Sequence, residues 1–168
     1  MTGLGLDAAT PICEGRALEF FASWSDSFEA FSDSFELLAD DCVWDQRPIP
    51  RLIGPRQARR FLRIARATLG LATCDVEILH IASVSDVVLV QRVDRLRRAD
   101  GSLIAAAPVA GVLQFRSDRI HHWREHFDSA EFVVQVAATG GVHLVRRLAA
   151  AGVNVVRRER SPRLTSPS

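Results

Sequence analysis

Cysteine is scarce in this chain of 168 residues, and long apolar runs are missing. Cys13, Cys42 and Cys74 are odd in number and widely spaced, which fits neither a disulfide framework nor a Cys-x-x-Cys metal site. We expect reduced thiols, most of them packed. The start, Met1–Thr10, lacks the basic and apolar regions of a secretory signal, and no later stretch reaches the roughly 18 consecutive apolar residues of a membrane span. These absences predict a cytoplasmic protein.

A strong net charge is missing too, because 21 basic residues face 20 acidic ones and leave a formal charge of +1. Such a balance gives no long-range field to gather nucleic acid or an anionic membrane. The sequence has no GxSxG, GxGxxG or GxxxxGK[ST] motif, which removes the common nucleophile, dinucleotide and phosphate-loop sites. His121 and His122 are neighbours on a predicted strand and point to opposite faces. We therefore expect neither a metal nor another cofactor.

The chain does have enough apolar sequence, 48% of its residues, for one domain with a sizeable core. Aromatic and apolar residues recur in steps of three and four, which predicts amphipathic helices: Phe20, Phe21, Trp24, Phe28, Phe31, Phe35 and Leu38. Good N-cap residues at Ser25–Ser27 divide this stretch into two helices, the second ending near Asp40–Asp41. A short strand over Cys42–Gln46 is expected next.

A third helix is predicted after a proline-rich loop over Arg47–Pro55. Pro55 suits the first helical position because its missing N–H is not needed there, and Gly70 suits the end. We expect its buried stripe to consist of Phe61, Ile64, Ala65, Thr68 and Leu69.

Beyond Leu71 the apolar period changes to two, which predicts strands over Asp75–Val84, Val87–Arg97, Leu103–Phe115 and Arg119–Phe127. Connections of two to four residues make them an antiparallel meander, and a short helix follows over Ser129–Ala138. Helices followed by a sheet indicate an α+β fold in which a curved sheet wraps around the N-terminal helices. We divide the chain into a flexible N-terminus (1–10), one domain (11–139) and a C-terminal helix with a solvated basic tail (140–168).

Charged residues lie within the apolar faces of two predicted strands. Alternation places Arg92 and Asp94 on one face with Val88, Val90 and Leu96. A desolvated pair of this kind serves either structure or function, and this strand alone does not decide between them.

The strand over Arg119–Phe127 adds a second buried acid, since Glu125 shares a face with His121, Trp123 and Phe127. If the two faces meet, Arg92 lies between two carboxylates, a geometry that drives their proton affinities apart and produces one acid and one base. Gln46, on one face with Cys42 and Trp44, offers an amide that either holds a water or bonds to backbone.

Three segments carry a family resemblance: Gln91–Leu96 (QRVDRL), Gly111–Phe115 (GVLQF) and Trp123–Asp128 (WREHFD). In this order they resemble the limonene-1,2-epoxide hydrolase family, which typically reads ERVD, GVF and WRDYFD. The resemblance implies an NTF2-like (SnoaL-like) cone. It also implies that Arg92 links the acid Asp94 to the base Glu125, and that Trp44 and Gln46 take the water-positioning places. Glu125, Trp44 and Gln46 stand where the family has aspartate, tyrosine and asparagine.

The expected activity is addition of water to an apolar, terpene-like or aryl epoxide, giving a vicinal diol without a covalent intermediate. The expected substrate pocket consists of Leu96, Ala107, Val109, Trp123 and Phe127. Small residues at 107 and 109 leave room for a bulky substrate, or Trp44 fills that room. Two alternatives stay open: a SnoaL-like isomerase or cyclase, and a non-catalytic module that binds an apolar ligand. The resemblance further implies a homodimer formed through the outer face of the sheet.

Overall fold

The computed structural model describes residues 10–46 and 49–140. Most of the predicted flexible N-terminus, 1–10, and all of the predicted tail beyond Gly140 lie outside the described residues. A final helix covers 129–140. The elements before it are α1 (Thr10–Ala22), η1 (Ser23–Ser25), α2 (Phe28–Ser34), η2 (Phe35–Leu37), β1 (Leu38–Gln46), β2 (Leu52–Ile53), α3 (Gly54–Leu69), β3 (Leu71–Val84), β4 (Val87–Arg98), β5 (Leu103–Arg116) and β6 (Arg119–Phe127).

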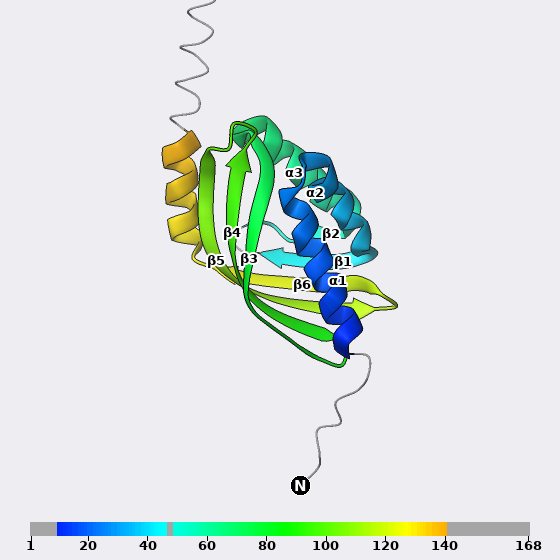
Figure 1. Cartoon of the computed structure of the whole chain (residues 1–168). Coiled ribbons are helices and arrows are strands. Elements are labelled where there is room, and N and C mark those ends of the chain that lie inside the picture. The colour runs from blue at the N-terminus through cyan, green and yellow to red at the C-terminus, as the bar shows by residue number, and fades with distance from the viewer. Residues whose placement is uncertain (1–9, 47–48, 141–168) are drawn as a thin grey trace, which may run out of the picture.

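The six strands form one mixed sheet in the order β2-β1-β6-β5-β4-β3. The run from β3 to β6 is antiparallel, as the short connections predict, whereas β1 pairs parallel to β6. Figure 1 shows this sheet curving around α1, α2 and α3, with the helix over 129–140 beside β5. The predicted α+β architecture is confirmed. Within the described ranges, no helix combines the length and apolar character needed to cross a bilayer.

The core lies between the inner face of the sheet and the aromatic side of α1 and α2. Phe20 and Phe21 contact Trp123 of β6 with ring centroids 5.3 and 6.5 Å apart. Trp24 stacks on Phe31 at 4.6 Å. The aromatic stripe therefore packs directly behind the strands that carry Arg92 and Glu125.

Two predicted helix ends are confirmed by their caps. The Ser27 hydroxyl accepts a hydrogen bond of 3.0 Å from the N–H of Ala30, so Ser27 is the N-cap of α2. Gly70 adopts a left-handed conformation (φ 76°), and its N–H donates to the carbonyl of Arg66 at the end of α3. Glycine suits this position because a Cβ would strain a positive φ.

The predicted end of the second helix, near Asp40–Asp41, is wrong. The helix ends at Ser34, a 3₁₀ turn follows, and β1 begins at Leu38, four residues before the predicted start of the strand. The reason is tertiary, since Leu38 is paired with Ile120 of β6 and buried there. Local helical spacing continues through Leu38, but strand pairing overrides it.

The predicted buried stripe of α3 is partly wrong. Ala58 and Leu62 are its fully buried apolar side chains, whereas Ile64 is 52% exposed and Thr68 is also exposed. Ile64 and Thr68 line a cavity instead of packing on the sheet. The predicted loop before α3 also holds a strand, β2, whose two residues pair with β1.

Candidate active site

Arg92 and Asp94 of β4 meet Glu125 of β6 on the inner face of the sheet. Nε and Nη2 of Arg92 donate to the two carboxylate oxygens of Asp94 at 2.8 and 2.9 Å. Nη2 also donates to Oε1 of Glu125. Arg92 is only 1% exposed, and both acids are buried. The predicted convergence of these side chains is thus confirmed as geometry.

Gly111 of β5 makes room for the guanidinium between the two neighbouring strands, β4 and β6. It is paired with Val90 on one side and with Glu125 on the other. A Cβ at position 111 would lie 3.0 Å from Nη1 of Arg92 and 3.0 Å from Val90 Cγ1, closer than nearly all such contacts. On its other side the guanidinium lies over the ring of Phe21, 4.3 Å from the centroid. Such a cation–π contact offsets part of the cost of burying the charge.

Burial has opposite effects on the pKa values of Arg92 and Asp94. Burial raises the pKa of Asp94 above its ordinary value, although the neighbouring Arg92 opposes the shift. Burial alone would lower the pKa of Arg92, but the charges of Glu125 and Asp94 outweigh it and raise that pKa further. The guanidinium is therefore permanently charged, while Asp94 holds a proton more readily than an exposed aspartate does.

Trp44 of β1 is oriented by its aromatic neighbours. Its ring stacks on Trp123 with centroids 4.2 Å apart and planes 1° from parallel, and it meets Phe61 of α3 edge-on. In this position its indole N–H donates to Oε2 of Glu125 at 3.1 Å. Trp44 therefore contacts the predicted base directly, in addition to lining the cavity.

Gln46, the other predicted water-positioning residue, is 6% exposed and paired in register with Glu125. Its Nε2 has no hydrogen-bond partner within residues 10–46 and 49–140, and the same holds for Nη1 of Arg92. A buried amide without a partner loses its interactions with water and gains nothing in return. Its place beside Glu125 is suited to holding a small oxygen ligand.

All five of these polar and aromatic residues line one cavity of about 430 Å³. Leu96, Ala107, Val109 and Phe127 line it too, in the places predicted for the pocket. Trp123 does not, and its predicted place in the pocket wall is wrong: it is fully buried behind Trp44, among the core aromatic rings. The remaining lining residues are Trp24, Phe31, Ile49, Phe61, Leu62, Ile64, Ala65, Thr68, Leu69, Leu71, Cys74, Phe132, Val133, Val136 and Ala137.

Sequence reasoning missed the walls that α3 and the helix over 129–140 supply. Strand alternation identifies inward residues only where the inner face is known, and a helix stripe does not reveal whether it faces a core or a cavity. The exposure of Ile64 and Val133, 52% each, places these two lining residues at the mouth. The charged groups of Arg92, Asp94 and Glu125, by contrast, are buried.

A metal site is not formed by the described part of the chain, where no group of three or more His, Cys, Asp or Glu side chains lies close enough together to hold an ion. Its cysteines are free, and burial raises the pKa of Cys42 to about 12 and that of Cys74 well above its usual value. The polar groups of the site are thus two carboxyl groups, one guanidinium, one side-chain amide and one indole N–H.

Comparisons with known proteins place this geometry in a family. The model of the limonene-1,2-epoxide hydrolase catalytic domain matches residues 16–138. Among solved structures, an LEH-like epoxide hydrolase from M. tuberculosis is similar (TM-score 0.62, 24% identity, 82% of this chain and 98% of that one). A candidate SnoaL-like polyketide cyclase from Jannaschia sp. CCS1 is similar too (TM-score 0.64, 14% identity, 81% and 99%). An NTF2-like protein from Anabaena variabilis ATCC 29413 also shares the fold (TM-score 0.59, 17% identity, 78% and 96%).

At these identities the solved structures show a shared fold, an NTF2-like and SnoaL-like cone. The family match covers well over half of the chain and includes every residue of the Arg92, Asp94 and Glu125 cluster. The chain therefore belongs to the limonene-1,2-epoxide hydrolase catalytic domain family.

Proposed function

We propose that this protein hydrolyses an apolar epoxide to a vicinal diol in one acid–base step. The observation that carries the proposal is the bonding of Arg92 to two buried carboxylates that line a largely apolar cavity. An arginine that holds two carboxyl groups in place positions one of them as a proton donor and the other as a proton acceptor for a small substrate.

In the proposed step, ionised Glu125 takes a proton from a water while the water oxygen bonds to an epoxide carbon. The carbon–oxygen bond of the ring breaks, and protonated Asp94 gives its proton to the leaving oxygen. The product holds both oxygens as hydroxyls. The site is reset when Glu125 loses a proton and Asp94 regains one, so no net acid or base is consumed.

Gln46 and Trp44 complete this proposal on the water side. The unpartnered Nε2 of Gln46 would donate to the attacking water next to Glu125. Trp44 would hold the carboxylate of Glu125 in place through its indole N–H. A correct angle of attack matters because misplacement by about 1 Å can cost roughly 100-fold in rate.

The size of the cavity limits the substrate. At about 30 Å³ per water-sized group, 430 Å³ corresponds to roughly 14 such groups. A terpene-like or aryl epoxide is of this size. The nearly complete apolar lining favours a substrate whose only strong polar group is the epoxide oxygen.

A second candidate, isomerisation or ring closure without bound water, is favoured by the shared fold of the candidate SnoaL-like polyketide cyclase. The same donor and acceptor would then act on a carbon acid. Incorporation of labelled water into product separates the two reactions, since hydrolysis adds one oxygen and isomerisation adds none.

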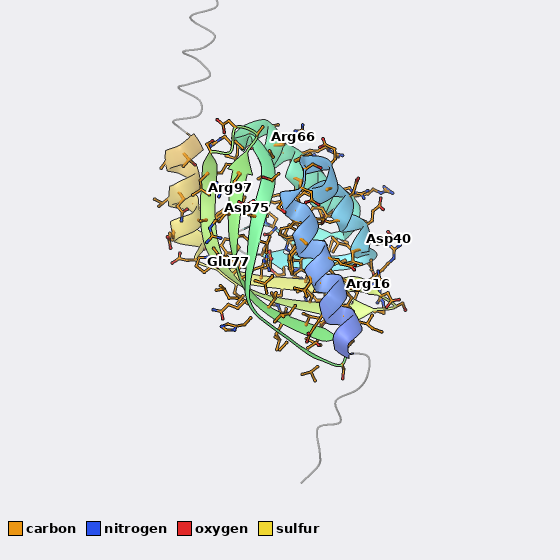
Figure 2. All side chains as sticks on the ribbon, viewed as in Figure 1. Arg16, Asp40, Arg66, Asp75, Glu77 and Arg97 are labelled. Atoms are coloured by element: carbon orange, nitrogen blue, oxygen red, sulfur yellow. The ribbon has the colours of Figure 1, made fainter. Side chains whose placement is uncertain are left out.

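The experiment is to measure diol formation from a panel of terpene and aryl epoxides by wild type, Asp94→Asn and Glu125→Gln. Matched controls are Asp75→Asn and Glu77→Gln, which replace two acids of β3 that Figure 2 labels. Asp75 pairs with Arg97 and Glu77 pairs with Arg95. We expect both site variants to fall to background and both controls to keep full activity. Background turnover by wild type across the panel would overturn the proposal. The expected homodimer, cytoplasmic location and absence of a cofactor stay predictions.

A further inference from the structure

A second buried arginine, Arg98 at the end of β4, binds the ends of two helices. It is 7% exposed, and its Nε donates to the carbonyl of Leu69, the last residue of α3, at 2.9 Å. Its Nη2 donates to the carbonyl of Thr139, near the end of the helix over 129–140, at 3.2 Å. Its Nη1 reaches Ser102 Oγ and the carbonyl of Leu103, both at 3.3 Å. Unlike Arg92, Arg98 forms no ion pair within the described ranges.

The two helices that Arg98 joins are walls of the cavity. The carbonyl ends of helices carry partial negative charge, so one cation between two such ends stabilises both. The two helix ends also lie close together, since a Cβ built at Gly140 would be only 3.9 Å from Leu69 Cδ2. Ile64 and Val133, one from each wall, lie farther along and are half-exposed at the mouth. Arg98 thus fixes the walls at the end where they meet.

Side-chain hydrogen bonds also attach the helix over 129–140 to β5. Pairing of β6 with β5 extends only to Val109, so the edge of β5 before that residue lies beyond the end of β6. Gln135 binds this edge through both amide atoms: its Oε1 accepts from the N–H of Ala106 at 2.8 Å, and its Nε2 donates to the Ala106 carbonyl at 3.0 Å. The hydroxyl of Thr139 donates to the carbonyl of Ile104 at 2.7 Å.

We propose that Arg98 is a positioning residue that determines ligand size, because it sets the separation of the two helical walls of the cavity. It touches no reacting atom. Loosening Arg98 lets the walls move apart, which weakens the fit of small ligands and admits bulky ones. The inference rests on the proposed function only for the identity of the substrate, since the size limit applies to any apolar ligand of the cavity.

A purely structural role for Arg98 would have a different signature. A destabilised protein binds every ligand less well by the same factor, because only the folded fraction changes. A change in wall separation alters the ratio between a small and a bulky ligand. The selectivity ratio, rather than the affinity or the activity alone, is therefore the decisive quantity.

The experiment compares binding of cyclohexanol and 1-adamantanol to wild type, Arg98→Met and Arg98→Lys by tryptophan fluorescence, because Trp24 and Trp44 line the cavity. The control is Arg97→Met, which removes the preceding arginine, paired with Asp75 on β3 (Figure 2). One methylene changes affinity in an apolar pocket by about 10-fold or more, so we expect Arg98→Met to shift the ratio at least about fivefold toward 1-adamantanol. The affinity ratio of Arg98→Lys should lie between those of wild type and Arg98→Met, and the ratio of Arg97→Met should equal that of wild type.

An unchanged ratio in a folded Arg98→Met protein would overturn the inference. If that variant does not fold, Gln135→Leu tests the same wall by removing both bonds to Ala106, and it should shift the ratio in the same direction. An unchanged ratio there would also overturn the inference. Binding of the two alcohols needs no reaction, so a protein that hydrolyses no epoxide but shows the shift refutes the proposed function and supports the role of Arg98.

Discussion

The indole N–H of Trp44 donates to one carboxylate oxygen of Glu125 at 3.1 Å, while Arg92 donates to the other oxygen of the same group. Both oxygens are thus held, and the carboxylate has one orientation. The stack of Trp44 on Trp123 fixes the indole in turn. A residue that the resemblance assigns to the water therefore contacts Glu125, the proposed base.

Removal of the indole donor should slow the reaction. A hydrogen bond to a charged group contributes about 1.5–3 kcal/mol, so we expect Trp44→Phe to lower kcat for diol formation roughly 10- to 100-fold with little change in KM. The comparison is with wild type, because every other change at this stack also disturbs the indole. A kcat of Trp44→Phe equal to that of wild type would contradict a role for the Trp44 donor.

Gln46 should increase the rate of diol formation without increasing the free energy of unfolding. Its Nε2 is buried without a partner in the described part of the chain, and such a group destabilises the folded state by about 1–3 kcal/mol. We therefore expect Gln46→Leu to leave the free energy of unfolding equal or higher, while diol formation falls at least tenfold. Urea unfolding and initial rates measure the two quantities. A clear loss of stability would show that this amide is satisfied in the folded protein.

Gly111→Ala should displace the arginine that links the acids. The added Cβ would lie 3.0 Å from Nη1 of Arg92, so the guanidinium must shift by a few tenths of an ångström. We expect a loss of diol formation of about tenfold, because a misplacement of ~1 Å costs roughly 100-fold and this shift is smaller. Gly15→Ala is the control, since its Cβ meets no atom within 4 Å. Full activity of Gly111→Ala would show that the position of Arg92 tolerates a shift.

The raised pKa of Asp94 predicts how stability depends on pH. Between its unfolded and folded pKa values the folded protein binds more protons at this carboxyl than the unfolded chain does, so its contribution falls as pH rises through that window. Asp94→Asn lacks this loss. We expect the stability difference between wild type and Asp94→Asn to move in favour of the variant as pH rises from acid to neutral. Urea unfolding at several pH values measures it, and the opposite trend would indicate a lowered pKa.

Strand alternation allowed the charged cluster to be predicted from sequence, because side chains at every second position share a face whatever the curvature of the sheet. It correctly brings Arg92 and Asp94 together with Glu125, residues separated by a whole strand. Alternation says nothing of depth, which is why Trp123 was expected in the pocket although Trp44 covers it.

The helical walls could not be predicted in the same way. Ile64 and Thr68 have the spacing of a core stripe, and only the position of the helix over 129–140 shows that they face a cavity. Arg98 carries no sequence signal either, because its acceptors are backbone carbonyls far apart in the chain. The positions of the helical walls and of the carbonyls that Arg98 binds depend on tertiary packing, which local sequence patterns do not show.

A single-turnover reaction in ¹⁸O-labelled water tests the proposed one-step addition most directly. With enzyme in excess over cyclohexene oxide, we predict one ¹⁸O atom in every diol formed and none in the carboxylates of Asp94 or Glu125. Unlabelled diol in the first turnover, followed by label in either carboxylate, would mean that a side chain attacks the epoxide, and it would contradict the account.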